Sequence, residues 1–211
     1  MQQTAPIVQE RQRLSQRLLE EPQHARLYVL RGMACFKLGE SDAAIADFDR
    51  AAQCNPTLTP SLWQRGLAYY YARRFTGGAR QFEIDMTVNG HDVEETVWRY
   101  LCQAQEHGAQ EARARLLPVR REARPVMGWV YQLFAGECDP ETVLAQHREA
   151  GSHEQFYSQL YVGLYWEAQG DEPQARRHIT QAAAMHQLED YMGWLALVHQ
   201  QLRGWESPQT V

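Results

Sequence analysis

The sequence has few of the features that mark membrane, secreted or nucleic-acid-binding proteins. No apolar run approaches the ~18 residues that a membrane-spanning helix needs, and the first residues contain no hydrophobic signal-peptide segment. Lysine and arginine number 21 against 26 aspartate and glutamate, so the net charge of −5 argues against a phosphate-binding basic face. We therefore expect no membrane span and no nucleic-acid partner. A cytoplasmic location is favoured, although a targeting or lipoprotein signal that had been removed would leave the same sequence.

The patterns that metal sites and enzymes require are also missing. The cysteines at 35, 54, 102 and 138 form no C-x-x-C pair, and the eight histidines form neither H-x-x-x-H nor H-E-x-x-H. There is no glycine-rich phosphate loop and no nucleophile motif. We predict free, mostly buried thiols, no metal site, no cofactor and no catalytic residue.

Small and apolar residues do recur, at spacings that suit a pair of packed helices. Within residues 28–56 the series is Gly32, Ala44, Phe48, Ala51 and Pro56, at offsets of 12, 16, 19 and 24 from the glycine. A glycine and an alanine facing each other let two helices approach closely. The segment 39–41 separates the two helices, and Ser41 is the expected N-cap of the second.

The same series returns along the chain. Gly66 stands one repeat length after Gly32, and Trp98 stands one repeat length after Trp63, an interval of roughly 34 residues. Near the end, an equivalent set stands at Gly163, Gly170, Ala175, Ile179 and Ala182. The intervening segment is irregular, because Pro125 forbids a continuous helix there.

This series resembles the tetratricopeptide repeat (TPR), a helix–turn–helix unit of ~34 residues. The resemblance covers roughly residues 25–187 and implies an all-α fold, a right-handed α-solenoid of helical hairpins. The irregular middle also resembles the bacterial lipoprotein NlpI family, over residues 98–108, 140–144 and 160–170. That family's lipidated cysteine near the N-terminus has no counterpart here.

We predict one domain, 1–211, with about eleven helices and no sheet. Its expected parts are a lead-in helix 6–20, repeat 1 at 25–58, repeat 2 at 59–91, a degenerate repeat 3 at 92–118, an irregular hairpin 119–151, repeat 5 at 152–187 and a capping helix 188–204. Further expected details are a turn at 75–77, short helices at 112–117 and 141–150, a cap-and-proline pair at Asp139-Pro140, and N-caps at Ser152 and Asp190.

The TPR resemblance implies that the first helix of each repeat (helix A) lines a concave groove. The corresponding peptide- or partner-binding residues are Val29, Met33, Phe36, Trp63, Gln64, Leu67, Tyr70, Tyr71, Glu95, Trp98, Arg99 and Gln105. An aromatic patch with a few polar groups is typical of a binding surface. The alternative is that the irregular middle folds back and that Trp63, Tyr70 and Trp98 belong to the core.

Two charged clusters have competing interpretations. The acids from Glu83 to Glu95, with His91, could perform acid–base chemistry if burial raised one pKa, but Asp92 is also a good helix cap. The arginines from 113 to 124 face one acid, Glu122, which suggests a solvated surface or a receptor for an acidic segment.

The predicted function is a non-catalytic adaptor or scaffold for a protein or peptide partner, and a homodimer through the solenoid ends is a further expectation. A structural or assembly-factor subunit of a larger complex is the second hypothesis. An enzyme that uses the acids between repeats 2 and 3 is the third.

Overall fold

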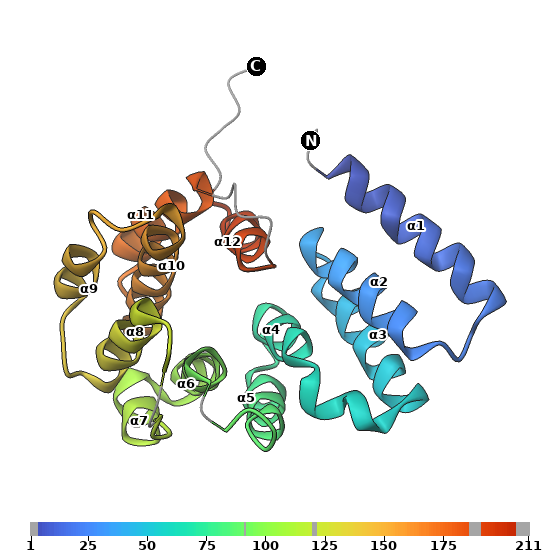
Figure 1. Ribbon diagram of the computed structural model, residues 1–211, viewed down its shortest axis with the longest axis horizontal. Coiled ribbons are helices and arrows are strands. Elements are labelled where there is room, and N and C mark those ends of the chain that lie inside the picture. The colour runs from blue at the N-terminus through green and yellow to red at the C-terminus, as the bar shows by residue number, and fades with distance from the viewer. Residues whose placement is uncertain (1–3, 91, 120–121, 186–190, 206–211) are drawn as a thin grey trace. The chain divides into compact units, whose positions relative to one another are not determined.

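All regular structure in the computed structural model is helical (Figure 1). The structure describes residues 4–90, 92–119, 122–185 and 191–205. Within these ranges it contains twelve α-helices, one short 3-10 helix and no strand, which confirms the predicted all-α class. The chain divides into two compact units, Met1–Asn89 and Gly90–Val211, which we describe separately. The single continuous domain stays a prediction.

Unit 1 consists of a lead-in helix followed by two helical hairpins. Its elements are α1 (Ala5–Glu20), α2 (Ala25–Lys37), α3 (Ser41–Cys54), the 3-10 helix η1 (Pro56–Ser61), α4 (Trp63–Tyr71) and α5 (Phe75–Asp85). The helix α1 covers the first hairpin, because Leu14 and Leu18 are buried against Leu27 of α2. The second hairpin begins later than expected, since Pro60 lies in η1 and α4 starts only at Trp63.

Unit 2 contains the irregular middle and the late repeat. Its elements are α6 (Val93–His107), α7 (Ala109–Ala114), α8 (Pro125–Ala135), α9 (Pro140–Gln146), α10 (Ser152–Gln169), α11 (Glu172–Ala184) and α12 (Tyr191–Leu202). The helix α7 occupies 109–114 rather than the predicted 112–117, because the positive φ of Gly108 (88°) turns the chain at once. The helix α9 is shorter than the predicted 141–150.

Close packing within three hairpins depends on glycine. A Cβ atom added to Gly32, Gly66 or Gly163 would lie 3.0, 2.6 or 2.8 Å from a side-chain atom of Phe48, Phe82 or Ile179, respectively. Each partner lies sixteen residues after its glycine, on the second helix of the same hairpin. The two helices of each hairpin therefore approach closely at the glycine, as predicted, but the side chain that meets the glycine is the one sixteen positions later and not the alanine that was expected to face it.

The turns of these hairpins share one left-handed residue. Gly39 (φ 76°) and Gly170 (φ 79°) end α2 and α10, and Arg73 (φ 58°) takes the equivalent place after α4. The predicted turn at 75–77 is wrong, because this left-handed residue reverses the chain earlier and α5 already starts at Phe75.

Helix caps were predicted correctly for aspartate and wrongly for serine. The Oδ1 atom of Asp139 accepts from the backbone N–H of Thr142 at 2.7 Å, as expected. The cap positions expected at Ser41 and Ser152 are held by the preceding residues, so both serines are already helical. The Gln155 amide donates to the carbonyls of Arg148 and Ala150 instead of closing a capping box. The expected cap at Asp190 lies outside the described residues.

Candidate functional site

Several aromatic residues expected to line a groove in unit 1 belong to its core. Phe36 and Tyr70 are 0% exposed and Tyr71 is 6% exposed. The rings of Phe36 and Tyr71 meet at 5.6 Å and those of Tyr70 and Phe75 at 5.6 Å, both edge to face. Leu67 is likewise buried. These residues hold α2, α4 and α5 together, so the expectation that they are open to a ligand was wrong.

Other predicted groove residues of unit 1 keep part of their surface exposed. Val29 and Met33 lie one turn apart on α2, with Lys37 a further turn along, and all three are partly buried. Trp63, at the start of α4, holds the position in the second repeat that Val29 holds in the first, and it is also partly buried. Gln64 beside it is buried. We call Val29, Met33, Lys37 and Trp63 the A-helix surface.

In unit 2 the predicted groove residues are mostly internal. Trp98 is 2% exposed and Glu95 is 6% exposed on α6. The indole of Trp98 lies close to the hydroxyl of Tyr161 on α10, which packs on α6. Arg99 donates from Nη1 to the backbone carbonyl of Arg115 at 3.0 Å, so it supports the end of α7. Only Gln105 of this set is exposed. The predicted exposure of the Trp98 indole was therefore wrong.

Two arginines, Arg31 and Arg65, were not predicted as site residues, although they stand at the repeat interval from Arg99. Arg31 forms a two-point ion pair with Asp47, at 2.8 and 2.7 Å. Arg65 donates to Gln81 Oε1 at 2.7 Å and to Asp49 Oδ1 at 3.0 Å. With Arg99, they form a series that ties each first helix to a neighbouring segment. Their even spacing along the sequence was the signal that could have found them.

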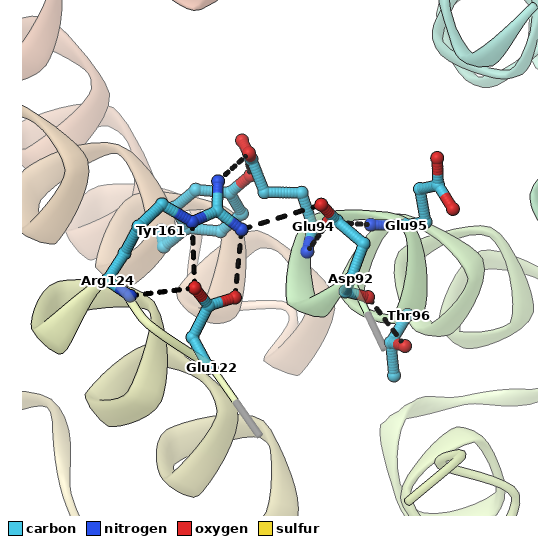
Figure 2. A network of polar contacts seen from close by, with 7 residues as sticks. All are labelled: Asp92, Glu94, Glu95, Thr96, Glu122, Arg124 and Tyr161. Carbon is cyan, nitrogen blue, oxygen red and sulfur yellow. Dashed lines mark hydrogen bonds and ion pairs between the residues drawn. The ribbon is translucent and has the colours of Figure 1, made fainter. Parts of the chain in front are cut away.

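A network of charged side chains in unit 2 joins three separate segments (Figure 2). The guanidinium of Arg124 donates from Nε and Nη2 to the two Glu122 carboxylate oxygens, both at 2.9 Å, and from Nη1 to Glu94 Oε2 at 2.5 Å. Asp92 lies 3.6 Å from the same guanidinium, and the Tyr161 hydroxyl donates to Glu94 Oε1 at 3.0 Å. The start of α6, the residues before α8 and the middle of α10 thus share one set of contacts.

The environment shifts the pKa values of this network in opposite directions. Burial raises the pKa of Glu94, and the charge of Arg124 offsets this only in part. Hydrogen bonds from Arg124 lower the pKa of Glu122. One guanidinium therefore reduces the repulsion among three neighbouring carboxylates.

The sequence suggested that the arginines from 113 to 124 form a solvated surface. In the structure several of them make contacts within the protein instead. Arg124 is committed to the network, and Arg113 donates from Nε to the Phe134 carbonyl at 3.3 Å. Arg115 pairs with Glu111, one turn before it. Residues 120 and 121 lie outside the described part of the chain.

The acids between the second and third repeats do not form one cluster. Asp92 Oδ1 accepts from the N–H groups of Glu94 and Glu95, at 2.7 and 3.3 Å, which confirms the capping interpretation. Asp85 is fully buried on α5, and burial raises its pKa to about 7. Glu83 on the same helix is exposed, and His91 lies outside the described residues. Among the described residues, no three His, Cys, Asp or Glu side chains are placed to hold a metal ion.

All four cysteines are free thiols, as predicted. Cys35 and Cys102 are buried, whereas Cys54 and Cys138 are partly exposed. Burial raises the pKa of Cys35 to about 11, so this thiol is a packing residue rather than a nucleophile.

Comparison with known proteins places this architecture in a class. The sequence model of the tetratricopeptide repeat matches residues 25–58, the stretch that forms α2 and α3. No curated protein sequence matches the chain. Together with the consecutive helix pairs, the match shows that the chain contains a tetratricopeptide repeat and is built as a helical repeat; proteins with this repeat typically mediate protein–protein interaction and are non-catalytic. The NlpI-like resemblance and the homodimer stay predictions. No helix in the described ranges is long and apolar enough to cross a membrane.

Proposed function

We propose that this protein is a non-catalytic adaptor that binds a segment of a partner protein along the A-helix surface of unit 1. The observation that supports this is the row of partly exposed apolar side chains on α2, continued at the repeat-equivalent position by Trp63 of α4. Aromatic and aliphatic anchors of this kind dominate the free energy of most protein interfaces. Lys37 adds a positively charged group at the end of the row.

The second helix of the hairpin offers no comparable surface. Its exposed side chains are small or polar, namely those of Asp42, Ala43, Ala46 and Gln53. Large apolar side chains with part of their surface in water therefore gather on α2 and not on α3. The rigid support also favours a binding role, because Gly32 and the Arg31–Asp47 pair hold α2 closely against α3.

Site-specific crosslinking tests the location of the binding surface. A photoreactive amino acid placed at Met33 should capture a partner protein in cells, whereas the same group at exposed Ala46 on α3 should not. Replacing Trp63 with alanine should reduce the Met33 crosslink at least about tenfold, the effect of losing a central interface anchor. Trp129→Ala, a change at another partly buried tryptophan, is the matched control and should leave the crosslink intact.

Thermal denaturation of the same variants separates loss of binding from loss of folding. Equal crosslinking from Met33 and Ala46 would contradict the proposal and would favour a structural subunit with several covered faces. An undiminished Met33 crosslink in a folded Trp63→Ala protein would remove the indole from the binding surface.

A further inference from the structure

A cavity of about 320 Å³ with a mixed polar and apolar lining lies between α9, α10 and α11 in unit 2. Its lining includes His147 and Arg148, which follow α9, and Arg177 and His178 of α11. The size falls at the lower end of the range for cavities that hold small ligands. It is far in sequence from the A-helix surface and independent of the function proposed above.

The two arginines leave this cavity with a positive charge that no described lining residue balances. Arg148 and Arg177 are exposed, and neither guanidinium makes a hydrogen bond or ion pair with the described residues. No aspartate or glutamate is among the described lining residues. The charge of Glu141 raises the pKa of His178, but burial and the charge of Arg177 together lower it by more. Elsewhere in the chain, Arg31, Arg65 and Arg124 are paired with carboxylates.

The two histidines are buried and oriented. His147 is 5% exposed, and its Nδ1 donates to the Val143 carbonyl at 2.9 Å. His178 is 6% exposed, and its Nδ1 lies 2.7 Å from Oε1 of Gln159. In both rings this contact uses Nδ1. The other ring nitrogen, Nε2, has no hydrogen-bond partner among the described residues. A polar atom at a cavity wall without a protein partner is satisfied by a ligand or by water.

We propose that this cavity binds a phosphate group. Two guanidinium groups match a dianion better than a single carboxylate, and the guanidinium fork fits phosphate oxygens. The amide nitrogen of Gln159 remains available as a further donor, since its oxygen faces His178. A neutral Nε2 accepts from a P–OH group, and a protonated one donates to a phosphate oxygen, so phosphate satisfies the imidazoles in either state.

Calorimetric titration of the full chain with inorganic phosphate tests the site. A titration with chloride at the same ionic strength is the reference. Variants of two α11 residues, Arg177 and Arg176, are the test and its matched control. Both are exposed arginines, but only Arg177 lines the cavity. Arg177→Gln should weaken phosphate binding at least about tenfold, the effect of losing a charged hydrogen bond. Arg176→Gln removes the same charge and should change the affinity less than about twofold, because salt screens exposed charges.

Further titrations distinguish the source of the phosphate. Glycerol 3-phosphate represents a small metabolite and a phosphoserine peptide of unrelated sequence represents a protein segment, and tighter binding of either one supports the site. Succinate tests the alternative dianion. Absence of phosphate binding, binding of succinate alone, or equal losses in the Arg176 and Arg177 variants would overturn the proposal. Circular dichroism should be unchanged in both variants, since neither side chain supports the fold.

Discussion

The hairpins α4–α5 and α6–α7 follow each other in the chain and share an arginine at the same repeat position, yet they are built differently. Gly66 follows Arg65 and lets the Phe82 ring of α5 touch the α4 backbone. Tyr100 follows Arg99, is 1% exposed, and packs edge to face on Phe134 of α8 at 5.1 Å. The second helix of this hairpin, α7, has only six residues. At this repeat position a glycine permits close contact with the second helix of its hairpin, whereas a tyrosine also contacts α8, while α6 still packs on α7.

The largest effect should follow from giving α4 the residue that α6 carries. In Gly66→Tyr, the new side chain collides with Phe82, and we expect a loss of at least about 3 kcal/mol in the free energy of unfolding. Gly128→Tyr is the control, because a Cβ atom there meets nothing within 4 Å. Urea denaturation measures both. Similar midpoints for the two variants would show that the glycine contact does not define the hairpin.

Replacing Trp98 of α6 and replacing Trp63 of α4 should also change the stability by different amounts. Trp98→Ala removes a fully buried indole and should cost about 3–5 kcal/mol of stability. Trp63→Ala removes a partly exposed one and should cost clearly less. Calorimetric melting of the two variants makes the comparison. If Trp63→Ala melts as early as Trp98→Ala, Trp63 is a core residue and the A-helix surface loses its anchor.

A pH effect should arise from α5, where Asp85 stands at the position that Ala51 holds in the first hairpin. Its pKa of about 7 in the folded chain exceeds its ordinary value of 3.8, so the folded state binds the proton more tightly. The stabilisation is therefore complete below about pH 4 and is lost as the pH rises through 7. A pKa shift of about three units corresponds to at most about 4 kcal/mol in the free energy of unfolding between low and high pH. We expect a change of about 2–3 kcal/mol.

Asp85→Asn should flatten this dependence, since the amide does not ionise. Urea denaturation at pH 5 and pH 8 should show the variant gaining stability relative to the parent chain at pH 8 and little at pH 5. Asp49→Asn serves as a control for an acid that remains partly exposed on α3. If the variant and the parent chain differ in stability by the same amount at pH 5 and at pH 8, Asp85 is in contact with water.

The smallest difference in stability should be between variants of Arg65 and Arg99. Arg65 makes hydrogen bonds to Gln81 and to the carboxylate of Asp49, with 12% of its side chain exposed, so Arg65→Ala should cost about 1–2 kcal/mol. Arg99 bonds to a backbone carbonyl and to Gln103, so Arg99→Ala should cost about 1 kcal/mol or less. Chemical denaturation resolves this difference. A larger loss for Arg99 would mean that α7 depends on it more than α5 depends on Arg65.

The sequence predicted well those features that depend on contacts between residues close together in the chain. The glycines of three hairpins meet residues sixteen positions later, so a repeat pattern captures them. The exposure of Trp98 could not be predicted in this way, because Tyr161 comes from α10, four helices further along the chain. The role of Arg124 was missed for the same reason, since its partner Glu94 is thirty residues away. Helix position tells which way a side chain points, but not what covers it.

The network around Arg124 also bears on the order in which the chain folds. Contacts within the α2–α3 hairpin close loops of sixteen residues, as between Arg31 and Asp47, and such contacts form early because their entropy cost is small. The hydrogen bond between Tyr161 and Glu94 closes a loop of 67 residues. During synthesis, Glu94 and Trp98 must wait for α10 to emerge before they are covered. A ribosome-bound chain that stops at residue 150 would therefore show a folded first hairpin while α6 remains open to proteases and chaperones.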